Sequence, residues 1–123
     1  MTNEPKYNLP PDAVSLESKF VELPLSGEET RRILEGRQVA FTFPLRYEAI
    51  QRSILHHENL PSALYQIWRV QRLTLNYVAL HLFRENGYPS SSEFRARWTQ
   101  KHGNWNPRDR VFIHYLRRVD VNA

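Results

Sequence analysis

The segment RVFIHYLRRV (residues 110–119) alternates apolar and polar side chains, and this pattern constrains the fold more than any other feature of the sequence. Successive side chains of a strand point to opposite faces, so the alternation predicts a strand. Three further segments read the same way: KFVELPL (19–25), QVAFTF (38–43) and ALYQIWRVQRL (63–73). Because strands stand near both ends of the chain, an all-helical bundle is excluded and a mixed α and β fold is expected.

Helix signals lie between these strands. Two serines, each followed three residues later by a glutamate, predict helix starts by the capping-box rule: Ser26 with Glu29, and Ser90 with Glu93. Glycine reaches the left-handed backbone conformation that commonly ends a helix, so we expect these two helices to stop at Gly36 and near Gly103.

Two more helices are predicted with weaker signals. PLRYEAIQRSILHHENLP (44–61) opens on a proline and spaces its apolar residues at helical intervals until Asn59 and Pro61. A second helix, capped by Thr74 or Asn76, should run to about Glu85, where Asn86-Gly87 and then Pro89 stop it.

The length of 123 residues suits one compact domain, which we place at residues 19–123 behind an extended or disordered arm at residues 1–18. No apolar run approaches the 18 residues of a membrane span, and the polar start MTNEPKYNLPPD does not read as a signal peptide. The chain has no cysteine, which agrees with a reducing compartment. We therefore expect a cytoplasmic protein.

Charge is divided unevenly along the chain. Residues 1–60 hold 7 Lys and Arg against 9 Asp and Glu, whereas residues 61–123 hold 10 against 4. Fourteen of the 17 basic residues are arginine, the side chain best suited to bidentate phosphate contacts and to stacking on bases. This pattern favours a polyanion partner such as nucleic acid, and an Arg-rich soluble surface without such a partner is the alternative.

The segment IWRVQRLTLNYVALHLFRENGYPSSSEFRARWTQKHGNWNPRDRVFIHYLRRV (67–119) resembles the second half of ASCH domains, small members of the PUA-like superfamily. In that family a strand leads to a helix ending in Glu-x-Gly-aromatic, a serine-capped helix with Glu-Phe and Trp follows, and a Val/Ile/Phe-rich strand closes the domain. ETRRILEGRQVAFTF (29–43) looks, more loosely, like the family's Ile-Leu-x-Gly-Arg-Lys-x-x-Thr element.

The resemblance implies an α+β fold, a small, partly closed PUA-like β-barrel of about four to six strands with helices over its openings. It also implies a link to RNA, and in one branch an amidohydrolase of N4-acylated cytidine nucleosides that works with a Lys, a Thr and a Glu. Carried over to this chain, the Glu is Glu85, a candidate acid/base, while Gln38 stands at the Lys position and Phe41 at the Thr position. Neither replacement can transfer a proton, and the neighbouring Arg37 is too basic to do so.

Candidate binding residues follow from these patterns. We predict a pocket lined by Arg37, Gln38, Phe41 and Glu85, although Glu85 reads equally as a solvated carboxylate paired with Arg84 or Arg95. Four arginines around the last strand either hold phosphates or protect a strand edge from aggregation: Arg108, Arg110, Arg117 and Arg118.

The tryptophans divide into two groups. Trp68, in an apolar strand, and Trp98, on a helix's apolar face, are expected in the core. Trp105, in a polar turn, is the expected exposed aromatic for base stacking.

The histidine spacing predicts no metal site, and no cofactor is expected. We therefore predict an RNA- or nucleotide-binding module with RNA or a modified nucleoside as partner. Two alternatives stay open: an enzyme on nucleic-acid substrates (the amidohydrolase above, or a ribonuclease) with Glu85 as acid/base, and a small accessory domain that binds a protein.

Overall fold

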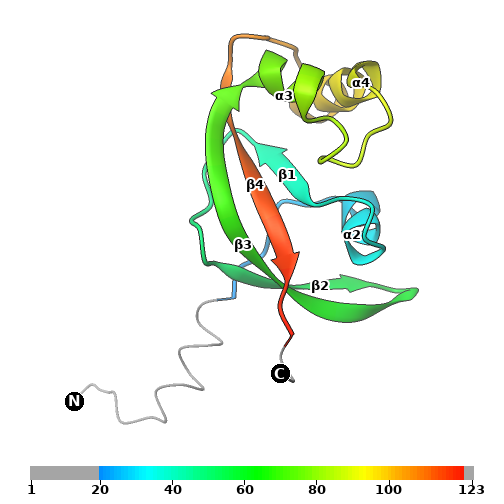
Figure 1. Cartoon of the computed structure of the whole chain (residues 1–123). Coiled ribbons are helices and arrows are strands. Elements are labelled where there is room, and N and C mark those ends of the chain that lie inside the picture. The colour runs from blue at the N-terminus through cyan, green and yellow to red at the C-terminus, as the bar shows by residue number, and fades with distance from the viewer. Residues whose placement is uncertain (1–19, 121–123) are drawn as a thin grey trace, which may run out of the picture.

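The computed structural model describes residues 20–120 and shows one sheet with helices at its side and at one end (Figure 1). The predicted arm at residues 1–18 lies outside the described residues. The elements in chain order are α2 (Gly27–Leu34), β1 (Ala40–Phe43), β2 (Arg52–His57), β3 (Leu60–Thr74), α3 (Leu75–His81), α4 (Ser91–His102) and β4 (Arg110–Arg118). Among residues 20–120, no helix is long and apolar enough to cross a membrane.

The four strands of residues 20–120 form an antiparallel sheet in the order β1-β4-β3-β2. β3 is 15 residues long and pairs with β2 over its first half and with β4 over its second half. Each neighbouring strand is rotated by about 20–25° with a fixed hand, so a long shared strand makes the sheet curl. The result is a strongly curled half-barrel, as expected for a partly closed PUA-like barrel, and the α+β class is confirmed.

The predicted helix starts are confirmed by their capping bonds. The Ser26 hydroxyl accepts the N–H of Glu29 at 3.1 Å, and the Glu29 carboxylate accepts the N–H of Ser26 at 3.1 Å, which completes a capping box. At α4 the Ser90 hydroxyl accepts the N–H of Glu93 at 3.2 Å. Gly103 ends α4 in the left-handed conformation with φ 88°.

α3 is shorter than predicted. Thr74 caps it as expected, but the helix ends at His81, because Leu82 leaves the helical region with φ −127°. The following residues form turns as far as Gly87, whose φ is +83°. Glu85 is therefore carried by a turn segment and not by a helix.

The prediction of a helix over residues 44–61 is wrong. Residues 52–57 form β2, which joins β3 through a two-residue turn at Glu58 and Asn59. Ser53 and Leu55 are buried while Ile54 is exposed, so the true period is two, and Ile54 and Leu55 are not neighbours on one helical face. Pro61 is tolerated because that part of β3 pairs only with β2.

The predicted first strand, residues 19–25, is also wrong within the described part of the chain. Phe20 forms a single parallel bridge with Arg52, and the Val21 N–H donates to the Arg52 carbonyl at 2.8 Å. Pro24 has no N–H to continue a ladder, and α2 begins three residues later.

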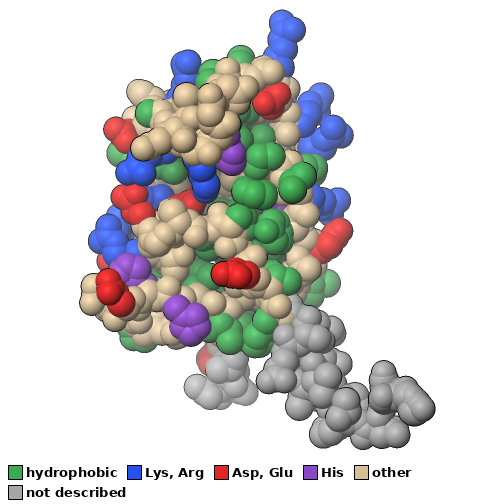
Figure 2. Space-filling model, turned by 180° about the vertical axis from the view of Figure 1, so that it is seen from behind, with side chains coloured by type: hydrophobic (Ala, Val, Ile, Leu, Met, Phe, Trp, Pro, Cys, Tyr) green, Lys and Arg blue, Asp and Glu red, His purple; other side chains and the backbone are tan. Residues whose placement is uncertain are grey.

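The core consists of two clusters of buried residues. The first contains these buried residues: Leu23, Ile33, Phe41, Leu55, Ala63, Tyr65, Ile67 and Leu116. The second lies beneath α3 and α4 and contains Leu75, Val78, Ala79, Phe94, Trp98 and Val111. Trp98 is thus in the core as predicted. On the surface that faces away from the viewer in Figure 1, hydrophobic side chains form a band (Figure 2).

A buried histidine connects β4 to β1 and to the loop after β1. His114 is fully buried, and its ring stacks on Phe41 with a centroid distance of 4.4 Å. Nε2 accepts the N–H of Tyr47 at 2.9 Å, which leaves the ring proton on Nδ1, 3.3 Å from the Phe41 carbonyl oxygen. Burial lowers the pKa of His114 from 6.5 to about 4, so the ring is neutral at pH 7.

We predict an acid-induced loss of stability from His114. Between pH 6.5 and about 4 the unfolded chain binds a proton at this residue and the native chain does not. Its contribution to the free energy of unfolding is therefore complete above pH 6.5 and falls by about 3 kcal/mol as the pH drops to 4. Urea unfolding at several pH values, with an NMR titration of the ring, measures this. A His114 ring that titrates near pH 6.5 would refute the prediction.

Candidate nucleic-acid interface

A β-bulge in β3 places two successive residues, Trp68 and Arg69, on the outer side of the sheet. Ile67 pairs with Leu116 and Arg69 pairs with Tyr115, so Trp68 is an extra residue with no partner on β4. Before the bulge, odd-numbered residues such as Ile67 face the first core cluster, and after it Val70 does. Trp68 is 48% exposed, so its predicted place in the core is wrong, because the bulge interrupts the alternation on which the prediction depended.

Residues of the loop before β2 hold the bulge in place. The Ile50 N–H donates to the Ile67 carbonyl at 2.6 Å, and the Ile67 N–H donates to the Gln51 carbonyl at 2.9 Å. Ile50 adopts φ +77°, an unfavourable conformation for a β-branched residue, and its side chain is exposed. The hydrogen bonds at Ile67 therefore keep a strained residue beside the bulge.

Tyr115 lies next to Trp68 on the outer side of the sheet. Its neighbours across the sheet are Ala40 on β1 and Arg69 on β3. The Trp68 and Tyr115 rings are tilted by 49° with centroids 5.9 Å apart, and the Arg69 guanidinium lies 5.7 Å from the Tyr115 ring centroid. Tyr115 is half-buried.

Glu85 borders this aromatic pair. Its backbone carbonyl accepts the N–H groups of Val39 at 3.1 Å and Ala40 at 3.0 Å, which ties the turn segment to β1. Within residues 20–120, its carboxylate oxygen Oε1 is buried without a hydrogen-bond partner, and the suggested ion pair with Arg84 or Arg95 is not formed. Burial raises the pKa of Tyr115, and the negative charge of Glu85 raises it further, so the phenol is neutral at pH 7.

The other three residues of the predicted pocket do not face an open cavity with Glu85. Phe41 is 1% exposed and stacks on His114. Gln38 is 2% exposed; its Oε1 accepts from Arg32 Nε at 3.0 Å and its Nε2 donates to the Ala40 carbonyl at 2.9 Å. Arg37 is exposed and pairs with Glu35.

Trp105 and the four predicted arginines occupy separate places. Trp105 is half-buried beneath the Arg95 guanidinium, 5.0 Å from its ring centroid, so it is not the exposed aromatic that we expected. The arginines are all exposed. Arg110 and Arg118 stand at opposite ends of β4, roughly 27 Å apart at 3.4 Å per residue, and therefore do not form one compact patch.

Five exposed arginines project from β3 and β4, and we call them the strand arginines: Arg69, Arg72, Arg110, Arg117 and Arg118. Within residues 20–120 none of them forms an ion pair. Five of the six ion pairs in that range use carboxylates of α2 or its C-cap: Glu28, Glu29 and Glu35. The positive charge of the strands is thus uncompensated, whereas that near α2 is neutralised.

A groove of about 240 Å³ between α2 and α4 is lined by residues that the sequence did not predict as binding residues. Arg97 pairs with Glu28 at 3.1 Å, and Lys101 pairs with Glu29 at 3.2 Å, so its charges neutralise one another. A smaller cavity beside it is lined by Thr42 and Asn86, which are joined by a 2.8 Å hydrogen bond. Asn86 was read only as part of a helix stop, and no sequence signal paired it with Thr42.

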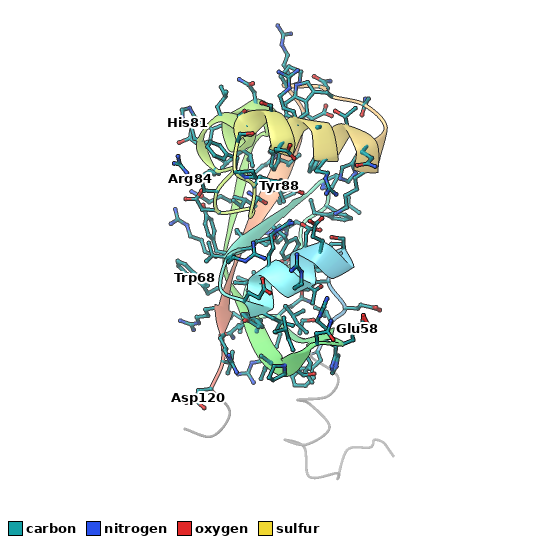
Figure 3. All side chains as sticks on the ribbon, turned by 90° about the vertical axis from the view of Figure 1, so that its right-hand side faces the viewer. Glu58, Trp68, His81, Arg84, Tyr88 and Asp120 are labelled. Atoms are coloured by element: carbon teal, nitrogen blue, oxygen red, sulfur yellow. The ribbon has the colours of Figure 1, made fainter. Side chains whose placement is uncertain are left out.

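The aromatic pair and the α2–α4 groove lie on different sides. Figure 3 shows Trp68, His81 and Arg84 along one side of the molecule, while Tyr88, which lines the groove, lies toward the viewer. Among residues 20–120, no group of three His, Asp or Glu side chains is placed to hold a metal ion. The side of the sheet that carries the Trp68–Tyr115 pair therefore offers guanidinium groups, aromatic rings and the Glu85 carboxylate.

No protein-family model matches the chain, and no curated protein matches its sequence. Its fold is similar to that of solved structures. The ASCH domain from Lactobacillus crispatus superposes with a TM-score of 0.57 at 11% identity, covering 85% of this chain and 84% of that one. A DUF984 protein from Enterococcus faecalis gives 0.61 at 14% identity, with 89% and 88% covered.

A third structure, ASCH from Zymomonas mobilis, gives a TM-score of 0.54 at 12% identity and covers 80% of this chain and 71% of that one. The chain therefore has an ASCH-domain-like fold, which confirms the fold that the resemblance implied. Identities of 11–14% show the fold alone and do not transfer a site or an activity.

The packing around Gln38 generates a prediction at Gly87. Gly87 has φ +83°, and a Cβ added there would stand 2.5 Å from Arg32 Nε and 2.6 Å from Gln38 Oε1. Gly36 has a similar φ of +80° but open space around it. We expect Gly36→Ala to cost about 1 kcal/mol through its backbone alone, and Gly87→Ala to cost about 3 kcal/mol because it also breaks the buried Arg32–Gln38 bond. Urea unfolding measures both, and equal costs would contradict this account.

Proposed function

We propose that this protein is an RNA- or nucleotide-binding module that uses the face of β3 and β4 on which Trp68 and Tyr115 lie. The observation that carries the proposal is the set of strand arginines, which are exposed and without ion-pair partners in residues 20–120. Guanidinium groups bind phosphate oxygens through two parallel hydrogen bonds, and two of these arginines, Arg69 and Arg117, lie with Tyr115 on one face of the sheet, where they suit neighbouring phosphates of a nucleic-acid backbone.

Glu85 supplies a different kind of contact on the same side. An ionised carboxylate can only accept hydrogen bonds, and the exocyclic amino and ring N–H groups of nucleobases are donors. The buried Oε1 lacks a partner in residues 20–120, and a buried polar atom without a partner is costly, so a donor group of a ligand that reaches it would be stabilised there. Glu85 is therefore the proposed base-contacting residue beside the phosphate-binding arginines.

The packing does not support the cytidine-amidohydrolase alternative. That route needs a lysine at position 38, but both polar groups of Gln38 are occupied by Arg32 and the Ala40 carbonyl. Phe41, at the position of the threonine, is buried against His114. A role as a ribonuclease or as a protein-binding accessory domain has no specific support from the described contacts, so binding is the function that we put forward.

The proposal predicts salt-dependent RNA binding. Fluorescence anisotropy with a labelled single-stranded RNA at 50 and 200 mM salt should show affinity that falls as salt rises. Arg69→Ala/Arg117→Ala should weaken binding about 10-fold or more and reduce the slope of log K against log salt by about 1.4, at 0.7 per phosphate contact on a single strand. Glu85→Gln should weaken binding with little change in that slope, because the carboxylate does not neutralise a phosphate.

The matched control removes two arginines of equal charge that already have carboxylate partners. Arg31 pairs with Glu35 and Arg46 pairs with Glu48. Arg31→Ala/Arg46→Ala should change affinity less than 3-fold, because surface pairs distant from the interface contribute little. Equal losses in the two double variants would show an effect of net charge only, and the absence of binding at 50 mM salt would exclude the proposed function.

A further inference from the structure

An aromatic pair that the fold does not need for its core lies beside the bulge in β3. Trp68 is 48% exposed although its neighbours Ile67 and Val70 belong to the first core cluster. A tryptophan buries 150–250 Å² when it is enclosed, so leaving half of it in water forgoes a large stabilisation. Bulges re-aim side chains and occur near functional sites, and here the bulge places both Trp68 and the next residue, Arg69, on the face that carries Tyr115 and Arg117.

Tyr115 fixes the position of Trp68. Its ring lies 5.9 Å from that of Trp68 and is itself held by Arg69, whose guanidinium lies 5.7 Å from the Tyr115 ring centroid. The hydrogen bonds of Ile67 with Ile50 and Gln51 hold the backbone on the other side. The exposed ring is therefore part of an ordered surface, so little side-chain entropy is lost when a flat ligand stacks on it.

Two guanidinium groups flank the aromatic pair. Arg69 lies opposite Tyr115 on β3, and Arg117 lies two residues beyond Tyr115 on β4, hence on the same side and about 7 Å along the strand. The Arg117 side chain reaches Gln66, to whose Oε1 it donates at 3.3 Å. Both arginines are exposed and, within residues 20–120, have no carboxylate partner.

We infer that Trp68 and Tyr115 form a stacking platform for an unpaired base of a single-stranded nucleic acid, with Arg69 and Arg117 at the adjacent phosphates. The inference rests on the proposed function and specifies its ligand. Aromatic rings bind bases through the π-face, which is accessible only when the base is unpaired, and guanidinium groups hold the backbone. A duplex would present phosphates but no free base faces, so it should bind more weakly than a single strand.

The test separates stacking from charge with two ligands, three single variants and the double arginine variant. The ligands are a labelled single-stranded RNA and an abasic ribose-phosphate oligomer of the same length and charge. Trp68→Leu keeps an apolar side chain without a π-face, Trp68→Phe keeps a smaller π-face, and Ile54→Ala changes another exposed apolar residue, on β2. Both positions are at the surface, and circular dichroism checks that each variant folds.

We expect Trp68→Leu to weaken RNA binding about 5-fold or more, the lower end of what one stacked base contributes, and to leave abasic binding unchanged. Trp68→Phe should retain most of the affinity, and Ile54→Ala all of it. Arg69→Ala/Arg117→Ala should weaken the binding of both ligands. With 5-fluorotryptophan incorporated, the ¹⁹F resonance lost in Trp68→Phe should be the one that shifts most on addition of RNA.

Other outcomes identify which idea fails. If Trp68→Leu binds RNA like the wild type while the double arginine variant does not, the platform is wrong and the proposed function stands. If the wild type binds the abasic oligomer as tightly as RNA, bases do not contribute and the platform is again wrong. If the wild type binds neither ligand at 50 mM salt, the proposed function fails, and the platform fails with it.

Discussion

The pairing of β3 with β4 determines the position of almost every other element. β4 pairs with β1 on its other edge, and β3 continues past β4 to pair with β2. Both outer strands, β1 and β2, are therefore positioned by the β3–β4 ladder. The curl of this shared strand encloses the first core cluster, and its last residue, Thr74, caps α3. Loss of the β3–β4 register would therefore displace both core clusters, because a slip of one residue exchanges the faces of every side chain.

A second constraint is the buried contact of Arg32, Gln38 and Gly87. A buried cation is costly unless it is fully partnered, and Arg32 has Glu28 at 3.5 Å, Gln38 at 3.0 Å and the Tyr88 ring at 5.0 Å. Gln38 stands at the position that corresponds to the lysine of the ASCH-like amidohydrolases, and its side-chain oxygen is a hydrogen-bond partner of the Arg32 guanidinium. In this chain the region beside Gly87 has a packing role, and the exposed chemistry lies on the other side of the turn segment, around Tyr115.

The sequence was informative wherever local rules decide structure. Ser26, Ser90 and Gly103 marked helix ends correctly because caps depend on neighbouring residues only. It failed at β2, because Glu58-Asn59 is a weak turn signal and Ile54 and Leu55 satisfy either period. It failed at Trp68 because a bulge is created by cross-strand pairing, which alternation within one strand cannot show.

The candidate site was predictable only in part, for the same reason. Glu85 and the arginines of β4 were found from composition and resemblance, and the structure places Glu85 beside Tyr115. Their grouping with Trp68 depends on a register that brings residues 68–69 and 115–117 together across the sheet. The aromatic expected to be exposed, Trp105, packs against Phe94 because residues far apart in the chain meet beneath α4.

The division of charge between α2 and the strands also bears on how fast a partner is captured. The carboxylates at α2 are paired with basic side chains, whereas the strand arginines form no ion pair within residues 20–120. The region of β3 and β4 is therefore more positive than the region of α2. A polyanion within about a Debye length, some 10 Å at 0.1 M salt, would be attracted to β3 and β4 and oriented toward them before contact. Encounters are therefore pre-oriented, and a larger fraction of collisions is productive than random orientation would allow.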